Sequence, residues 1–138
     1  MGTHSINIGV LTSSRADFGI YLPLLRKMRA DDSMNMNLIV FGSHLSRFHG
    51  YTLQEIEAEG FVADYRLETL LAGDSPEAIA TSMSLCMMKF SQFWGTYAAD
   101  FDLVFCLGDR YEMFAAVSAG APFGVKFAHL HGGEQTLG

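Results

Sequence analysis

Short apolar runs that break abruptly into glycine and ionisable residues recur along this chain and alternate with stretches of helical periodicity. The runs cover residues 6–11, 37–41, 61–67, 102–107 and 122–130. Continuous apolar runs of this length are typical of strands that are buried on both faces. Strands that alternate with helices are joined by right-handed crossovers and form a parallel sheet with helices on both faces. The pattern therefore predicts a doubly wound α/β fold.

The helical stretches carry recognisable start signals. Apolar spacings of three and four predict a helix over 18–28, and an alanine-rich stretch predicts another over 111–120. Thr52 and Glu55 match the capping box, in which each side chain bonds a free amide at the helix start. We therefore expect a short helix that begins after Thr52 and ends at Gly60.

A longer helix is predicted to start at Ser75, an N-cap residue that is followed by proline at the first helical position. This helix carries a stripe of methionine and aromatic side chains at helical spacing, which is typical of core packing. The stripe consists of Met83, Met87, Phe90, Trp94 and Tyr97.

Composition limits the domain count and the classes of partner. The 138 residues, 49% of them hydrophobic, are enough for one ordinary core, so we predict a single domain over residues 1–138. The net charge of -6 and the lack of a Lys/Arg cluster argue against nucleic acid or an anionic membrane as the main partner. A phosphorylated ligand is still compatible, because a few cations and backbone amides are enough to hold a phosphate group.

Cysteine usage and targeting signals favour a cytoplasmic protein. Cys86 and Cys106 both fall in apolar patterns and are predicted to be buried thiols, with no disulfide framework or paired-cysteine zinc motif. The first residues lack the charged and then apolar run of a secretion signal. No apolar stretch reaches the ~18 residues that a membrane span needs.

Polar residues follow four of the five predicted strands. In a parallel sheet the carboxyl ends of the strands share one edge, which is where open α/β sheets bind ligands. We therefore expect four exit segments to meet there and to supply cations, carboxylates and imidazoles for acid/base chemistry on an anionic ligand. The exit segments are Ser13–Arg15, Gly42–His44, Gly108–Arg110 and His131–Glu134.

Several of these residues have a structural alternative. Asp109 is a candidate acid/base and is equally a candidate N-cap, with Glu112 at the third helical position. Arg110 lies at a helix start, where the dipole disfavours a cation, so its presence favours a negative partner. Arg15 is either a phosphate ligand or a solvated surface residue. His44 is either a ligand contact or a hydrogen-bonded loop histidine.

The last exit segment follows a pair of closely spaced histidines. His129 and His131 would face the same way in an extended strand, so a metal site completed by Asp109 or Glu134 is conceivable, although no further ligand spacing supports it. Gly132–Gly133 either frees backbone amides for a ligand or makes a turn. The first exit segment lacks the G-x-G-x-x-G pattern of dinucleotide-binding folds, and we predict no cofactor.

Four segments in this order and spacing resemble the hydrolysing UDP-N-acetylglucosamine 2-epimerases, a family that includes enzymes of the sialic and legionaminic acid pathways. The resemblance covers essentially the whole chain, and four segments in register are far more specific than any one alone. It implies a GT-B-type enzyme built from two Rossmann-like domains, with the active site in the cleft between them. The segments are 12–19, 42–45, 108–112 and 128–134.

This chain resembles only the first of those two domains. The resemblance implies that the second domain binds most of the UDP, so we expect an N-terminal fragment that is cut short after its fifth strand and is inactive alone. The full enzyme is expected to convert UDP-GlcNAc and water to ManNAc and UDP, and to be a homo-oligomer.

The resemblance also implies roles for individual residues. Removal of the weakly acidic C2 proton must be coupled to loss of UDP from C1, which gives a glycal to which water then adds. Asp109 is implied as an acid/base. Some relatives carry a catalytic glutamate where this chain has His131, so either His131 or Glu134 is the second proton-transfer group. Residues expected to bind the substrate are Arg15, which resembles the family's phosphate contact, with Ser14, His44, Arg110, Gly132 and Gly133.

Three alternatives stay open. One is a family member that acts on a modified UDP-sugar, such as a diacetamido-trideoxy compound. A second is a non-catalytic response-regulator-like or nucleotide-binding module, which would need an acidic cluster where this chain has Ser13, Ser14 and Arg15. The third is a metal-dependent hydrolase that uses His129 and His131.

Overall fold

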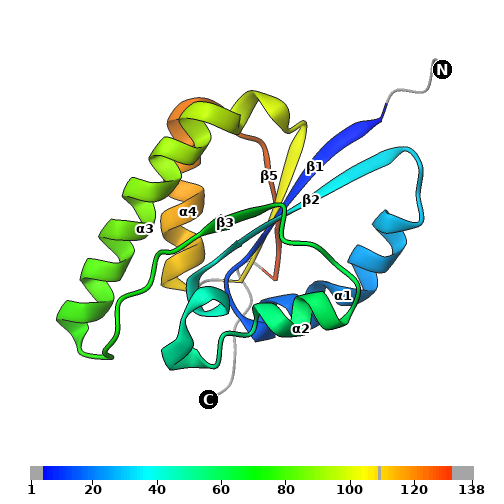
Figure 1. Ribbon diagram of the computed structural model, residues 1–138. Helices are drawn as coiled ribbons and strands as arrows, with labels where there is room; N and C mark the ends of the chain where they lie inside the picture. Colours follow the sequence, from blue (N-terminus) through cyan, green and yellow to red (C-terminus); the bar gives the residue numbers. More distant parts are fainter. Residues whose placement is uncertain (1–4, 109, 132–138) are drawn as a thin grey trace.

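The computed structural model describes residues 5–108 and 110–131. Within these residues, five parallel strands form one sheet with helices on both faces (Figure 1). The predicted doubly wound α/β fold is confirmed. The strands are β1 (Ile6–Thr12), β2 (Met34–Phe41), β3 (Tyr65–Leu67), β4 (Leu103–Leu107) and β5 (Phe127–Leu130), and the helices are α1 (Arg15–Arg29), α2 (Leu53–Ala58), α3 (Pro76–Tyr97) and α4 (Tyr111–Gly120).

The strand order places a topological switch point in the middle of the sheet. The order is β3-β2-β1-β4-β5, so the chain moves outward on one side from β1 and returns to start on the other side at β4. β1 pairs with β2 over its full length and with β4 through Ile8, Gly9 and Val10. The carboxyl ends of β1 and β4 therefore flank the crevice in which α/β sheets of this kind bind their ligands.

Each face of the sheet has its own apolar core. On one face, Tyr21 of α1 and Ile56 of α2 pack with Val10 of β1, and all three are fully buried. On the other face, α3 and α4 cover the sheet, and Trp94 is buried against Val104 of β4. The indole Nε1 of Trp94 donates to the carbonyl oxygen of Ala116 at 2.9 Å, which joins α3 to α4. Because both faces are covered, the strands are almost continuously apolar.

The predicted start of α3 is confirmed, whereas that of α2 is wrong in its mechanism. Ser75 caps α3 through a hydrogen bond that its hydroxyl oxygen accepts from the amide of Ala78 at 3.1 Å. Thr52 makes no side-chain capping bond to α2. Its hydroxyl instead lies 2.9 Å from Nδ1 of His44. A tertiary partner has replaced the local one.

The third and fifth strands are shorter than predicted. β3 begins only at Tyr65, because the carboxylate of Asp64 accepts the hydrogen bond of the Leu38 amide at 2.7 Å in place of a backbone carbonyl. β5 begins at Phe127 because residues Ala121–Phe123 form a 3₁₀ turn that Gly124 closes in the left-handed region. Both differences come from interactions that cannot be predicted from apolar periodicity.

The methionine and aromatic stripe of α3 is core only in part. Phe90 and Trp94 are fully buried, but Met87 is 38% exposed, so the prediction is wrong for that residue. Cys86 and Cys106 are buried as predicted, and burial raises the pKa of Cys106 to about 11. In the described part of the chain, none of the helices is both long and apolar enough for a membrane span.

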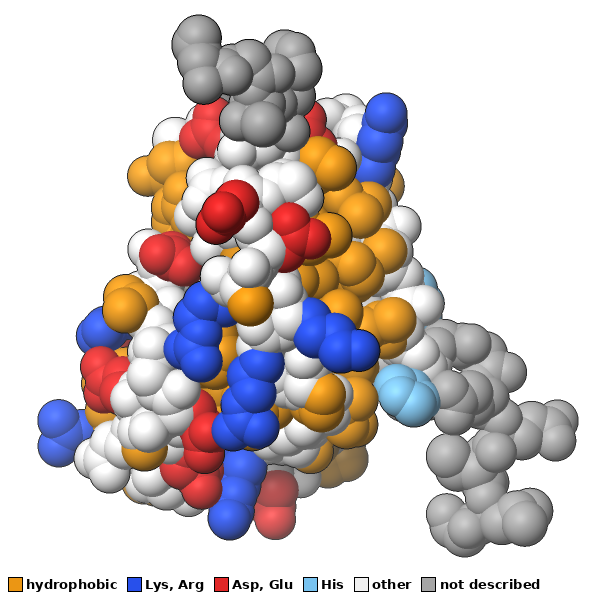
Figure 2. Space-filling model, turned by 90° about the vertical axis from the view of Figure 1, so that its right-hand side faces the viewer, with side chains coloured by type: hydrophobic (Ala, Val, Ile, Leu, Met, Phe, Trp, Pro, Cys, Tyr) orange, Lys and Arg blue, Asp and Glu red, His pale blue; other side chains and the backbone are white. Residues whose placement is uncertain are grey.

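Lys and Arg side chains gather on the side of the molecule where α1 lies (Figure 2). The last turn of α1 contributes Arg26, Lys27 and Arg29, where the helix dipole favours cations. Arg26 pairs with Glu59 at 2.7 Å, and the guanidinium of Arg29 lies 4.0 Å from the centre of the Phe61 ring. Arg26 and Arg29 therefore both have partners within the chain.

Candidate active site

The exits of β1 and β2 are bonded directly to each other. The amide and the hydroxyl of Ser43 both donate to the carbonyl oxygen of Ser13, at 2.9 and 3.0 Å. Gly42 makes this approach possible, because its φ is +64° and an added Cβ would lie 2.7 Å from the same carbonyl oxygen. The first and second exit segments are therefore brought together as predicted.

A buried carboxylate shapes the exit of β1. Oδ2 of Asp17 accepts hydrogen bonds from the amide of Ser13 at 2.9 Å and from its hydroxyl at 2.6 Å. Asp17 is only 3% exposed. Ser14, one of the predicted substrate ligands, is the N-cap of α1 and accepts from the Asp17 amide at 3.2 Å. The segment is therefore fixed by its own side chains.

The exit of β4 carries an ion pair between a half-exposed cation and a buried anion. Nη2 of Arg110 donates to Oε2 of Glu112 at 3.1 Å. The alternative of a capping box formed by Asp109 and Glu112 does not hold, because the N-cap position falls on Arg110 and places Glu112 at the second helical residue. Desolvation lowers the pKa of Arg110, but the hydrogen bond and charge of Glu112 outweigh it and the pKa is raised.

Arg15 lies on the surface at the start of α1. Its Nε is 3.1 Å from Oε1 of Glu55, and its side chain is 77% exposed. An exposed ion pair of this kind contributes little to stability, so the guanidinium can exchange its partner for a ligand. A shallow pocket of about 350 Å³ lies beside it, lined also by His49–Thr52 and Glu55. His49 was not among the predicted site residues, because a histidine within a loop has no distinguishing spacing.

His44 is a structural residue in this arrangement. It is fully buried, with Nε2 2.8 Å from the hydroxyl of Thr12 and Nδ1 2.9 Å from that of Thr52. Burial lowers the pKa of His44 from 6.5 to about 4, so the ring is neutral at neutral pH. This burial supports the alternative of a hydrogen-bonded loop histidine over that of a ligand contact.

Only the first residue of the last exit segment is described. His131 follows β5 with a φ of 56°, so the extended strand stops at Leu130 and the expectation that His129 and His131 share a strand face is wrong. Nε2 of His129 lies 2.6 Å from the carbonyl oxygen of Gly108. Over residues 5–108 and 110–131, no group of three or more His, Cys, Asp or Glu side chains could hold a metal ion. The predicted site residues outside the described part are Asp109, Gly132, Gly133 and Glu134.

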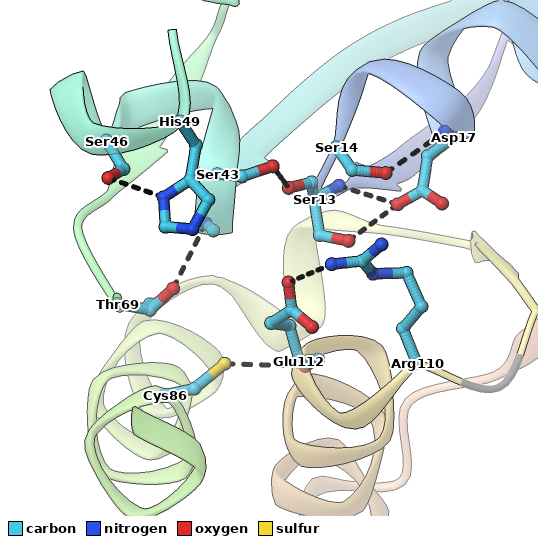
Figure 3. Close-up of polar contacts among 11 residues, drawn as sticks. Ser13, Ser14, Asp17, Ser43, Ser46, His49, Thr69, Cys86, Arg110 and Glu112 are labelled. Atoms are coloured by element: carbon cyan, nitrogen blue, oxygen red, sulfur yellow. Dashed lines mark hydrogen bonds and ion pairs between the residues drawn. The ribbon is translucent and has the colours of Figure 1, made fainter. Parts of the chain in front are cut away.

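Three of the four exit segments thus meet at the switch point, with Ser13, Ser43 and Arg110 around one edge of the sheet (Figure 3). Two carboxylates that the sequence analysis did not assign to the site, Asp17 and Glu112, lie directly behind this edge. Each occurs in the first turn of a helix that follows an exit segment. That position, and their places within segments 12–19 and 108–112, are the sequence signals that could have singled them out.

The sequence pattern of the UDP-N-acetylglucosamine 2-epimerase family matches residues 26–138. The chain belongs to this family. It is 35% identical over 131 residues to the polysialic acid biosynthesis protein P7 of Escherichia coli, and the aligned part covers 92% of this chain and 32% of that protein. It is 34% identical to the hydrolysing GDP/UDP-N,N'-diacetylbacillosamine 2-epimerase of Campylobacter jejuni, over 95% of this chain and 33% of that enzyme.

Solved structures of family members share the fold. A UDP-N-acetylglucosamine 2-epimerase superposes with a TM-score of 0.78 at 16% identity, over 96% of this chain and 35% of that structure. The Neisseria meningitidis enzyme bound to UDP-GlcNAc gives a TM-score of 0.72 at 14% identity, over 90% of this chain and 31% of that structure. The expected fold, a Rossmann-like domain of the GT-B type, is confirmed. The chain spans about a third of the length of the curated relatives that it matches.

Proposed function

We propose that this chain is the first domain of a hydrolysing UDP-N-acetylglucosamine 2-epimerase, which converts UDP-GlcNAc and water to ManNAc and UDP. The observation that carries the proposal is the gathering of three exit segments, with the cation Arg110, at the switch point of the sheet. Family membership supports the substrate class, since the Neisseria meningitidis relative is bound to UDP-GlcNAc. The rest of the site is then expected from a second domain, and this chain alone is expected to be inactive.

The reaction needs cations for the diphosphate and proton-transfer groups for the sugar. Arg110 and Arg15 are the proposed diphosphate ligands, because they are the arginines at the starts of α4 and α1, beside the switch point. Helix starts also offer free amides to an anion. Together these groups would stabilise the charge that UDP acquires as its bond to C1 breaks.

Asp109 is the proposed acid/base. It lies in the sequence between Gly108, which follows β4, and Arg110, the N-cap residue of α4. The carboxylate would remove the C2 proton as UDP leaves, which gives the glycal. Water then adds to C1, and C2 receives a proton on its opposite face from His131 or Glu134. Gly132 and Gly133 are proposed to present backbone amides to the substrate.

A second candidate substrate is a UDP-diacetamido-trideoxy sugar. The observation that favours it is the similarity to the Campylobacter jejuni enzyme at 34% identity and to the Legionella pneumophila UDP-N,N'-diacetylbacillosamine 2-epimerase at 29%. Both names describe hydrolysing 2-epimerases, so the proposed reaction type is the same. The two candidates differ at C4 and C6 of the sugar.

The reaction is tested with the full-length protein in D₂O, with UDP-GlcNAc and UDP-N,N'-diacetylbacillosamine as separate substrates. The proposal predicts equal amounts of UDP and free sugar, with one deuterium at C2 of the product. The substrate with the larger kcat/KM identifies the sugar. A 2-epimer that is still attached to UDP, or a product that keeps its original C2 hydrogen, would overturn the proposed reaction.

A further inference from the structure

Glu112 is an unusual residue in the described part of the chain, because it is a buried anion with one partner. It is 1% exposed, and its Oε2 is bonded to Arg110. Its second oxygen, Oε1, is also buried and has no hydrogen-bond partner among the described residues. A buried carboxylate is costly to keep unless its partner is well placed, so the Arg110 contact decides whether this side chain is tolerated.

Arg110 in turn occupies a position where its positive charge is locally unfavourable. It occupies the N-cap position of α4, where the positive end of the helix dipole disfavours a cation. Two buried carboxylates offset this. Glu112 bonds its Nη2, and the charge of Asp17 acts on the guanidinium from the exit of β1. Figure 3 shows the guanidinium between the Ser13 side chain and Glu112.

The remaining donors of this guanidinium are available to a ligand. In the described part of the chain, the bond to Glu112 is the only hydrogen bond of the Arg110 side chain, and it uses Nη2. The side chain is 48% exposed, whereas that of Glu112 is 2% exposed. The pair is therefore anchored on its buried side and open on its solvent side, which is the arrangement that a bidentate phosphate ligand needs.

We propose that Glu112 is a positioning residue, which holds the Arg110 guanidinium from behind, with Asp17, so that its free donors receive the diphosphate of the UDP-sugar. This inference rests on the proposed function. Glu112 itself does not touch the substrate. Loss of its charge leaves the arginine in place in the chain but frees its head group from the edge of the sheet.

The test uses the full-length enzyme and the variants Glu112→Gln, Arg110→Gln and the double variant. The dissociation constant of UDP is measured by calorimetry, with kcat, KM and the thermal unfolding midpoint. Glu112→Gln is expected to weaken UDP binding about tenfold, because the guanidinium loses the charged acceptor that holds it. Arg110→Gln should weaken it at least as much. The double variant should bind UDP no more weakly than Arg110→Gln alone.

Two further variants separate positioning from a merely structural role. Glu112→Asp keeps the charge on a shorter side chain and should recover part of the UDP affinity, and it also replaces Glu112→Gln if that variant does not fold. Glu59→Gln removes the exposed partner of Arg26 and should leave UDP affinity unchanged. Unchanged UDP affinity in Glu112→Gln, or additive losses in the double variant, would overturn the inference. A wild-type enzyme that neither binds UDP nor releases it would instead overturn the proposed function.

Discussion

Nε2 of His44 lies 2.8 Å from the hydroxyl oxygen of Thr12, at the very end of the central strand. The imidazole ring is fully buried, and its other nitrogen contacts Thr52 just before α2. One side chain therefore ties the end of β1 to the start of α2, across the segment that follows β2. The buried ring therefore holds together the segments that follow β1 and β2.

Because His44 is buried, the stability of the folded protein is predicted to fall as the pH is lowered. Burial lowers the pKa of His44 from 6.5 to about 4 in the folded protein. Between these values the unfolded chain binds the extra proton, so stability is fully present above pH 6.5 and is lost as the pH falls toward 4. The loss between pH 7 and 5 is expected to be about 2 kcal/mol.

Urea unfolding of the full-length protein at both pH values measures this loss. His44→Gln should be less stable at pH 7 but should lose less of its remaining stability at pH 5. His49→Gln changes an exposed histidine and serves as the matched control, with the wild-type pH dependence. An identical pH dependence in His44→Gln and the wild type would show that His44 does not carry it.

The architecture was predictable because strand and helix periodicities act over whole segments. The start of α3 followed from Ser75 and Pro76, whose effect is local. The capping role of Thr52 was not predictable, because the hydroxyl has a tertiary partner 8 residues away in sequence. The start of β3 only at Tyr65 depends on the Asp64 carboxylate, which accepts a hydrogen bond from an amide 26 residues away in sequence. Sequence patterns report local preferences and miss such exchanges.

The site was predictable in its location and less so in its composition. The exit segments of β1, β2 and β4 meet because parallel strands share a carboxyl edge. Burial decided which residues of the site can contact a ligand. His44 has the residue type of a ligand contact but lies beneath the surface, and Glu112 has the spacing of a capping residue but pairs with Arg110.

Asp17 is predicted to maintain the conformation of the first exit segment. Asp17→Ala removes the acceptor of both the amide and the hydroxyl of Ser13 and leaves a buried donor unpaired. The expected cost is about 2 kcal/mol of stability, together with weaker UDP binding. Chemical unfolding and UDP calorimetry on the full-length protein measure the two effects.

The chain supplies a matched control for this substitution. Asp31 accepts from the amide and the hydroxyl of Ser33 at 2.9 and 2.6 Å, the same distances as at Asp17, but on the exposed surface. Asp31→Ala should therefore have a much smaller effect on stability and none on UDP affinity. Equal effects of the two substitutions would show that burial at Asp17 is irrelevant.

Gly42 is predicted to be required for the contact between the first two exit segments. Gly42→Ala places a Cβ 2.7 Å from the Ser13 carbonyl oxygen, at a φ of +64°. The left-handed backbone alone costs about 1–2 kcal/mol, and the overlap adds to it. The unfolding midpoint should fall and KM for the UDP-sugar should rise. Gly19→Ala is the control, because no atom lies within 4 Å of its added Cβ within α1, and it should stabilise slightly.

Release of UDP by the full-length Asp109→Asn variant tests the central claim most directly. The claim is that the carboxyl edge of this sheet binds the UDP-sugar and that Asp109 transfers a proton there. UDP release is followed in a coupled assay, with UDP affinity and the circular dichroism spectrum measured on the same sample. We predict that release is abolished while UDP binding and the spectrum are unchanged. Undiminished release would contradict the account.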